Sequence, residues 1–492
     1  MSEVSEMPDR ELLSLEAAAE FLYVSKSTMY RLLTQGKLHG MKAGKQWRFR
    51  REDLVAYMQR GPAALALDNL PIEVLDAELA ALGDELVAAG TSTAESDDPS
   101  LAGEAGKVRQ LVRRMVWLLH ALGGSDIHLE PVWEAGQEYV RLRLRVDGVL
   151  RDVRHLPLAL GEPLVLEWKQ QAGLSLDEQS RPQDGSARFT FGGTLIPVRV
   201  SIVPTLYGER VAVRDIPTRV PTLDELGLAD SPLKEWVLRP HGLLLITGPG
   251  GSGKATTRAA CVRELTNRGL NIMAAEDQVE YVFPPEVAQL KVEGFTPAEA
   301  VRAILKQDPD VIIIGELRGD PQLAQAAALH AELGHLVLAC LHAYDSISTL
   351  YDFLEWGVKR SLLVDNVIGI VNQHLLLKLC PACRREQAPE ADLLAEVRKA
   401  ATQGGYHVPD AAVFHAPVGC DGCHEGYAGR LALQECFTFT PALKAAFLRG
   451  APREELTALA REEGQLSSFA VGVRKAAEGV TSLEEVMRRL PH

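Results

Sequence analysis

The chain has 492 residues, about three times the length of a typical domain, so we expect two to four folded units. Its 46% hydrophobic and 24% charged residues are typical of a soluble globular protein, and its net charge of −14 argues against a nucleic-acid coat. The sequence has no apolar run long enough to span a membrane, no secretory signal, and only 7 cysteines. These features predict a multidomain protein of the reducing cytoplasm.

The first predicted module, residues 10–60, is basic, with ten Lys/Arg against five Asp/Glu. A short helix over 16–22 and a second helix over 25–33 form a predicted helix-turn-helix. Residues 40–50 alternate like a hairpin wing, and a closing helix begins after them. The pattern resembles the excisionase-like, MerR-related winged helix-turn-helix modules.

This resemblance predicts DNA contacts from the second helix and phosphate contacts from the wing. The candidate DNA-binding residues are Lys26, Ser27, Thr28, Tyr30, Arg31, Lys45, Arg48 and Arg50. The alternative is a docking module whose basic face binds an acidic protein partner.

Three further segments follow. Residues 61–106 carry ten Asp/Glu and no Lys or Arg, which predicts an acidic linker with a possible helix near Ile72. Residues 107–220 contain alternating antiparallel strand patterns and form a predicted α+β domain. Residues 221–492 alternate buried apolar strands with helices, which predicts an α/β domain with a parallel sheet.

A phosphate-binding loop is predicted between the apolar strand 243–247 and the helix that follows it. Glycines let backbone N–H groups surround an anion, the helix N-terminus adds a positive dipole, and a lysine neutralises phosphate charge. The residues of this loop are Gly248, Pro249, Gly250, Gly251, Ser252, Gly253 and Lys254.

The position after the lysine departs from the usual pattern. A Ser or Thr there supplies a hydroxyl to Mg²⁺, whereas this chain has Ala255. Thr256 lies about 100° further round the helix and is a poor substitute. The sequence therefore favours nucleotide binding over rapid hydrolysis.

Acidic and histidine residues follow the other predicted strands. Glu316 comes directly after the strand 311–314, where a carboxylate holds Mg²⁺ or polarises the attacking water. Glu276 and Glu280 form a second acidic cluster. The histidines at the ends of the strand 336–341 either sense the γ-phosphate or are ordinary polar residues.

From about residue 107 onward, the ordered set of motifs resembles the secretion ATPases of type II secretion and type IV pilus assembly. The resemblance rests on SDIHLEP (125–131), RLRVDGVL (143–150), RPQDG (181–185), YGERVAVR (207–214), GPGGSGK (248–254), EDQVEY (276–281), LKQDPDVIIIGELRG (305–319), GHLVLACLH (334–342) and LCPAC (379–383). It implies a hexameric motor with a RecA-like P-loop NTPase domain, using ATP and Mg²⁺ and working with a platform protein at the inner membrane.

The resemblance also implies roles for individual residues. Lys254 would be the phosphate lysine, Glu316 the Walker B acid, and Glu276 and Glu280 the acids of the aspartate box. His335 and His342 would belong to the histidine box. The remaining implied nucleotide-binding residues are Ala255, Thr256, Arg199, Arg210, Arg214 and Arg318.

Two C-x-x-C pairs, Cys380–Cys383 and Cys420–Cys423, are separated by 36 residues. Four thiolates in this arrangement predict a closed tetrahedral Zn²⁺ site within a zinc element over 380–423, and the main alternative is a redox dithiol.

Two functions from different classes remain open on the sequence. The first is a cytoplasmic motor ATPase, peripheral to the inner membrane, that drives pilin or pseudopilin assembly slowly because of Ala255. The second is a non-hydrolysing, nucleotide-gated regulatory or DNA-binding protein built on a degenerate motor.

Overall fold

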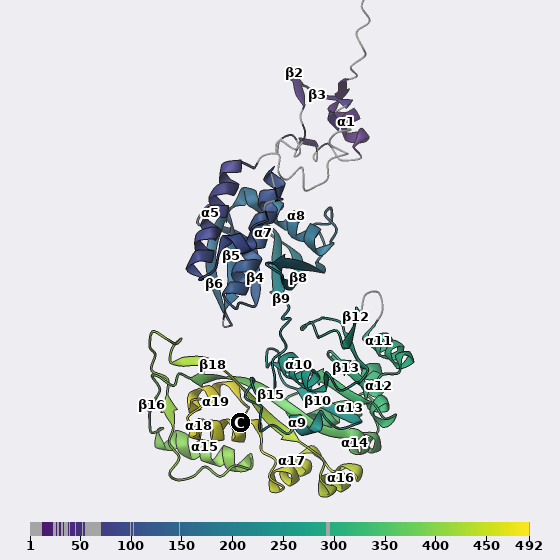
Figure 1. Ribbon diagram of the computed structural model, residues 1–492, viewed down its shortest axis with the longest axis vertical. Helices are drawn as coiled ribbons and strands as arrows, with labels where there is room; N and C mark the ends of the chain where they lie inside the picture. Colours follow the sequence, from purple (N-terminus) through teal and green to yellow (C-terminus); the bar gives the residue numbers. More distant parts are fainter. Residues whose placement is uncertain are drawn as a thin grey trace, which may run out of the picture. The chain divides into compact units, whose positions relative to one another are not determined.

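The computed structural model forms two compact units, Met1–Ile216 and Pro217–His492 (Figure 1). It describes residues 12–22, 26, 29–30, 33, 38, 40–44, 46–51, 53–54, 70–98, 100–101, 103–146, 148–291 and 296–491. Within these residues, no helix combines the length and the apolar character needed to cross a membrane.

The N-terminal module of the first unit is a small sheet against a short helix. Its elements are β1 (Leu12–Ser14), α1 (Leu15–Phe21), β2 (Met41–Ala43) and β3 (Gln46–Arg50). The sheet order is β1-β3-β2, and the predicted first helix and hairpin wing are confirmed. Phe49 of β3 is fully buried, together with Met29 and Leu54. Most of the predicted second and closing helices lies outside the described residues.

The rest of the first unit is built on a six-stranded antiparallel sheet of order β6-β5-β4-β9-β8-β7. Its strands are β4 (Asp126–Glu134), β5 (Gln137–Val146), β6 (Val149–Pro157), β7 (Gln183–Phe191), β8 (Thr194–Thr205) and β9 (Gly208–Asp215). Alternate residues of each strand enter one core, as the alternation in the sequence predicts. The predicted antiparallel strands are therefore confirmed.

Helices cover the apolar face of this sheet. They are α5 (Ile72–Ala88), α6 (Thr93–Ser96), α7 (Gly103–Ala121), η1 (Leu158–Leu160) and α8 (Gly161–Ala172). The sequence predicted an acidic linker over residues 61–106, whereas the described part of this segment is folded into the first unit. Ser92 caps α6, and the Asp97 carboxylate accepts hydrogen bonds of 2.9 Å from Arg114 of α7. Leu75 and Leu82 of α5 share the core of the sheet, so the segment belongs to the folded unit.

The second unit contains a seven-stranded sheet of order β12-β11-β13-β14-β10-β15-β18. The strands are β10 (Gly242–Thr247), β11 (Ile272–Glu276), β12 (Val287–Lys291), β13 (Val311–Ile314), β14 (Leu336–Leu341), β15 (Val367–Leu379) and β18 (Tyr427–Phe437). All neighbouring pairs are parallel except β15 and β18. This confirms the predicted parallel sheet with crossover connections.

Two helical layers bury the two faces of this sheet. One face packs against α11 (Pro297–Ile304), α12 (Pro321–Glu332), α13 (Ser346–Glu355), α14 (Arg360–Asn366), α16 (Pro441–Leu448) and α17 (Arg453–Glu462). The other face packs against α9 (Leu233–Trp236) and α10 (Lys254–Leu265). A short 3-10 helix, η2 (Leu305–Gln307), precedes β13. Because both faces are covered, strands such as Ile312–Ile314 are continuously apolar.

A C-terminal layer surrounds the long ends of β15 and β18. It comprises the two-stranded sheet of β16 (Arg385–Glu386) and β17 (His415–Ala416), and the helices α15 (Ala391–Gln403), α18 (Ser468–Ala477) and α19 (Leu483–Arg489). These elements form a separate core that includes Leu376, Leu431 and Val473.

We expect Lys169→Met to lower the free energy of unfolding of the first unit by about 3 kcal/mol, because it leaves a buried carboxylate unpaired. The Lys169 ammonium is fully buried and contacts Glu209 Oε1 at 2.8 Å and the Glu178 carbonyl at 2.6 Å. Urea denaturation followed by tryptophan fluorescence would measure the change.

The matched control in the same unit is Lys107→Met, since Lys107 pairs at 2.5 Å with Asp76, whose side chain is 58% exposed. Its removal should change stability by less than about 0.5 kcal/mol. Equal losses in both variants would contradict the role of the Lys169 ion pair.

Candidate functional site

The phosphate loop connects the end of β10 to the start of α10, as the sequence predicts. Gly248, Gly251 and Gly253 have φ values of 140°, 73° and 83°, a region that favours glycine. A Cβ on Gly248 would lie 2.2 Å from the carbonyl oxygen of Gln373. The glycines are therefore required by backbone conformation and by close packing on β15.

The ammonium of Lys254 lies at the centre of this loop. It donates hydrogen bonds of 2.9 Å to the carbonyls of Gly248 and Pro249, and it lies 3.3 Å from Nδ1 of His342. Burial lowers the pKa of Lys254, while Cys340, Glu316 and Glu280 act in the opposite direction. The lysine is thus held at the loop by carbonyl oxygens that phosphate oxygens could replace.

His342 connects Lys254 to the predicted acid. Its Nε2 lies 2.7 Å from Glu316 Oε1, and its Nδ1 lies 3.1 Å from the Gly248 carbonyl. Arg318 binds the other side of Glu316 at 3.1 Å and Asp277 at 2.8 Å. Arg318 adopts a φ of 46°, which turns the chain sharply after the acid. The structure therefore brings Lys254, His342, Glu316 and Arg318 together at the carboxyl edge of the sheet.

Glu276 lies at the end of β11 but is only 2% exposed. Its Oε1 forms an ion pair with Arg258 of α10, and its Oε2 accepts a hydrogen bond of 3.0 Å from Gln289. Burial raises the pKa of Glu276, and the Arg258 charge opposes this rise. Glu280, by contrast, is exposed.

Ala255 stands where a hydroxyl would ligate Mg²⁺, and the next two hydroxyls are already engaged. Thr256 accepts a hydrogen bond of 3.1 Å from the Tyr281 hydroxyl, and Thr257 donates one of 2.8 Å to Gln373. Mg²⁺ prefers oxygen ligands such as carboxylates. The carboxylates of Glu316 and Asp277, which both pair with Arg318, are ligands of this type. They fit a hydrated Mg²⁺ held through acids and substrate phosphates, with no hydroxyl from the loop.

A polar run in the middle of β15 supports the loop from below. Gln373 donates to the Ser252 carbonyl at 2.8 Å, and Asn372 bridges the Thr247 hydroxyl at 3.0 Å and the Ala343 carbonyl at 3.1 Å. Gln434 of β18 donates to Gln373 at 2.9 Å. These residues were not predicted from the sequence, although three consecutive polar residues inside an apolar strand were a usable signal.

His335 lies away from the other predicted residues. It directly precedes β14, whose first residue pairs with Gly242 at the start of β10. The six residues of β14 lie between it and His342, so the two histidines are about 23 Å apart, because each strand residue advances about 3.3 Å. Its Nδ1 lies 3.0 Å from the His330 carbonyl. The structure therefore does not bring His335 to the phosphate loop of the same chain.

The three predicted arginines of the first unit have acidic partners within that unit. Arg199 lies 3.4 Å from Asp184, Arg210 lies 2.7 Å from Glu130, and Arg214 lies 2.9 Å from Asp126. Their side chains are 31%, 40% and 64% exposed. Their contact with nucleotide stays a prediction.

The described DNA-binding candidates lie at the surface of the N-terminal module. Lys26 pairs with Glu16 at 2.9 Å, Tyr30 is 54% exposed, and Arg50 is exposed. Arg48 is half-buried and donates to Gln46 at 2.8 Å. The predicted residues Ser27, Thr28, Arg31 and Lys45 lie outside the described residues.

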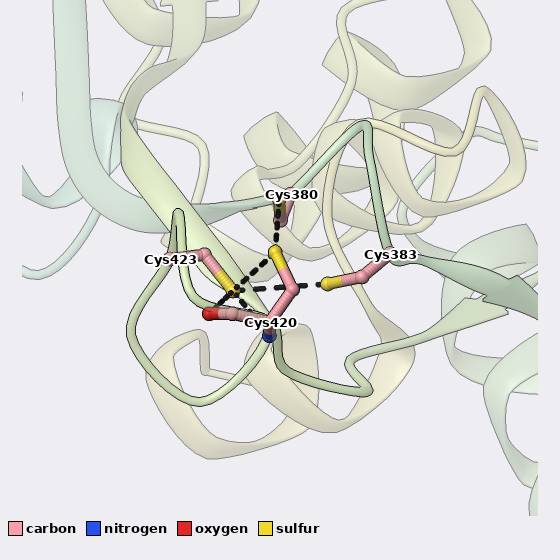
Figure 2. Close-up of side chains that lie close together, drawn as sticks. All are labelled: Cys380, Cys383, Cys420 and Cys423. Atoms are coloured by element: carbon pink, nitrogen blue, oxygen red, sulfur yellow. Dashed lines mark hydrogen bonds between the residues drawn. The ribbon is translucent and has the colours of Figure 1, made fainter.

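The four predicted metal ligands converge from two loops, after β15 and before β18 (Figure 2). The Sγ atoms of Cys380 and Cys420 are 3.9 Å apart, those of Cys383 and Cys423 3.7 Å, and those of Cys420 and Cys423 3.6 Å. A tetrahedral Zn²⁺ with Zn–S bonds of about 2.3 Å requires sulfurs about 3.8 Å apart. The predicted cluster is confirmed, and its geometry fits zinc.

The thiols of this cluster influence one another. Burial alone would raise the pKa of Cys423, but the N–H of Cys420 and the thiols of Cys420 and Cys383 lower it to about 7. The remaining cysteines, Cys261, Cys340 and Cys436, lie outside the cluster.

Comparison with known proteins gives two family matches. A model described as type II/IV secretion system protein matches residues 102–488, and a helix-turn-helix domain model matches residues 12–62. The second match supports the predicted N-terminal helix-turn-helix.

Several curated proteins resemble the chain over most of its length. The type II secretion system protein HxcR of Pseudomonas aeruginosa is 38% identical over 373 residues, which cover 74% of this chain and 73% of HxcR. The type IV pilus assembly ATPase PilB of Myxococcus xanthus is 34% identical over 443 residues, which cover 88% of this chain and 74% of PilB.

Two solved structures share the fold. The pilus retraction motor PilT with bound ADP superposes with a TM-score of 0.56 at 23% identity, covering 78% of this chain and 97% of PilT. The ATPase DotB of Legionella pneumophila superposes with a TM-score of 0.57 at 20% identity, covering 80% of this chain and 97% of DotB.

We expect the purified protein to carry about one Zn²⁺ per chain, because four clustered thiolates complete a closed site. Cys383→Ser and Cys423→Ser should each lose most of this metal and lower the melting temperature, since metal binding contributes to folding. Metal content by mass spectrometry and a thermal melt would measure both effects. Cys436→Ser, which lies outside the cluster, is the control. Loss of Zn²⁺ in that variant, or a wild type without bound Zn²⁺, would contradict the zinc site.

Proposed function

The chain belongs to the type II/IV secretion system protein family, and we propose that it is a motor that couples ATP hydrolysis to the assembly of pilin or pseudopilin subunits at the inner membrane. The observation that carries the proposal is the chain of contacts from Lys254 through His342 to Glu316. It joins a phosphate-binding group to an acid able to orient water. The names of two relatives, a type II secretion system protein and a type IV pilus assembly ATPase, support the choice of cargo.

The proposed chemistry is positioning and charge neutralisation rather than covalent catalysis. Phosphate oxygens take the place of the Gly248 and Pro249 carbonyls as acceptors for Lys254, while the N–H groups of the loop and the start of α10 face the anion. Glu316 accepts a proton from, or orients, the attacking water. His342 contacts both Glu316 and Lys254, so a shift of Lys254 on phosphate binding is transmitted through the imidazole to Glu316.

Mg²⁺ would supply charge neutralisation between the phosphates, held by Glu316 and Asp277 with water completing its shell. Ala255 offers no hydroxyl, and the hydroxyls of Thr256 and Thr257 bind Tyr281 and Gln373. We therefore propose weak magnesium binding and slow turnover. The alternative of a non-hydrolysing, nucleotide-gated regulatory or DNA-binding protein rests on Ala255 and on the basic N-terminal module. The contacts among Lys254, His342 and Glu316 do not favour it.

The proposed working form is a cytoplasmic homohexamer, peripheral to the inner membrane, that engages a membrane-anchored platform protein. Arg199, Arg210 and Arg214 are proposed to reach nucleotide in that assembly. Since each of these side chains already pairs with an acid, phosphate oxygens would compete with carboxylates for the guanidinium groups.

The N-terminal module is proposed to bind DNA, with an acidic protein surface as the alternative partner. The match to a helix-turn-helix model and the basic charge of residues 10–60 support this proposal. Arg48 and Arg50 on β3 are suited to phosphate contacts from the wing.

We expect magnesium-dependent ATPase activity that falls about 100-fold or more in Lys254→Ala, because the main phosphate cation is removed. Ala255→Thr should lower the magnesium concentration for half-maximal rate about tenfold by restoring a hydroxyl ligand. Steady-state phosphate release over a magnesium titration would measure both. Lys234→Met, which removes an exposed ion pair with Asp224, is the control. The motor would be contradicted by a wild type that binds ATP without turnover while Ala255→Thr gains activity. That result would support the nucleotide-gated alternative.

The double variant Arg48→Ala/Arg50→Ala should weaken binding to duplex DNA and make its salt dependence shallower by about two in the log–log slope, as two phosphate contacts are lost. Fluorescence anisotropy at several salt concentrations would measure this. Arg219→Ala is the control, because Arg219 lies outside the module and is 76% exposed. A wild type that does not bind duplex DNA at low salt would contradict the DNA proposal and favour an acidic partner.

A further inference from the structure

The helix that follows the phosphate loop carries a charged side chain into the protein interior. Arg258 on α10 is 3% exposed, and its guanidinium forms an ion pair with Glu276, which is 2% exposed. The same guanidinium donates a hydrogen bond of 2.6 Å to the carbonyl of Gly315. A buried charge is tolerated only when it is paired and hydrogen-bonded, so these contacts fix the position of Arg258.

The position of Arg258 relates it to Lys254. It follows Lys254 by four residues in the same helix, so the two side chains project from the same helix face, one turn apart. Lys254 lies at the loop, and Arg258 lies one turn further along α10, where it contacts the ends of neighbouring strands. The guanidinium thereby fixes the helix that bears the phosphate lysine against neighbouring strands.

The contacts of Arg258 reach residues next to the proposed acid and histidine. Gly315, whose carbonyl it binds, directly precedes Glu316. Its Nη1 lies 3.7 Å from Sγ of Cys340, two residues before His342. The N–H of Leu317 also binds the Cys340 carbonyl at 2.9 Å, which joins the two strand ends. One guanidinium of α10 therefore contacts Glu276 at the end of β11, Gly315 directly after β13, and Cys340 near the end of β14.

Both carboxylate oxygens of Glu276 are occupied by protein groups. Arg258 binds Oε1, and Gln289 binds Oε2 at 3.0 Å. Gln289 is itself held, since it donates to the Tyr281 carbonyl at 2.9 Å and its Oε1 accepts from the N–H of Phe283. The Glu316 side chain, by contrast, is 22% exposed at the sheet edge. Glu276 is thus placed to neutralise Arg258 and not to meet a substrate.

We propose that Arg258 is a positioning residue that fixes Glu316 relative to Lys254, and that Glu276 is its counter-ion and not an acid of the reaction. This inference rests on the proposed ATPase function and assigns roles within the same site. Arg258 acts on turnover by holding Gly315, so that the acid stands at the correct distance from bound phosphate.

The first test is Arg258→Lys in the full-length protein. An ammonium keeps the positive charge for Glu276 but lacks the planar fork that also reaches Gly315. We expect kcat to fall about 10- to 100-fold through misplacement of Glu316, with KM for ATP and the melting temperature close to those of the wild type. Arg263→Lys, on the same helix with an exposed side chain, is the matched control and should keep the wild-type kcat. A wild-type kcat in Arg258→Lys would overturn the positioning role.

The second test separates a counter-ion from a catalytic acid. Glu276→Leu alone leaves Arg258 buried and unpaired, so it should lower both the melting temperature and kcat. The double variant Arg258→Met/Glu276→Leu removes both charges, and we expect it to recover the melting temperature lost in Glu276→Leu. Its kcat should match that of Arg258→Met alone, because Glu276 acts only through Arg258. A double variant no more stable than Glu276→Leu, or much slower than Arg258→Met, would overturn the counter-ion role.

Failure of the proposed function has a different outcome. A wild type without magnesium-dependent turnover would contradict the proposed ATPase function. If the wild type hydrolyses ATP and Arg258→Lys has the same kcat, only the positioning role is contradicted. If the wild type shows no turnover, the melting temperatures of the variants still test whether Glu276 is the counter-ion of Arg258. A double variant more stable than Glu276→Leu supports the counter-ion, and equal stabilities overturn it.

Discussion

Four parallel strands of the second unit end at one edge of a single sheet, and the site depends on this constraint. Because β10, β11, β13 and β14 run in the same direction, the residues that follow them are brought to the same edge however far apart they lie in the sequence. The phosphate loop, Glu276, Glu316 and His342 all occupy such positions. The apolar strands that carry them are buried on both faces, and the polar groups that follow the strands are held by hydrogen bonds and ion pairs.

The parts of the site that the sequence predicted well are those encoded locally. The phosphate loop combines an apolar strand, glycines at the positive φ positions and Lys254 within a dozen residues. The two C-x-x-C pairs each fix two thiols by spacing alone, and the sheet only has to bring the loops together at the ends of β15 and β18. Strand alternation likewise predicted the antiparallel sheet, because the period of two depends only on which face is buried.

The parts that the sequence did not predict depend on long-range packing. An arginine in a helix is usually exposed, and only the fold shows that Arg258 points to Glu276. The acidic stretch before α7 was predicted as linker because its arginine partner, Arg114, lies in the next helix. The two histidines of β14 belong to one motif, yet a strand of six residues places His335 and His342 at opposite edges of the sheet.

The buried pair of Arg258 and Glu276 also constrains how this chain can change over evolutionary time. A substitution that removes either charge alone leaves the other charge buried and unpaired. Replacing both residues by apolar ones leaves two side chains that can pack in the interior. A lineage that leaves this arrangement must therefore pass through a destabilised intermediate or exchange both residues at once. The two positions are expected to be inherited as a unit, even though one lies on α10 and the other on β11.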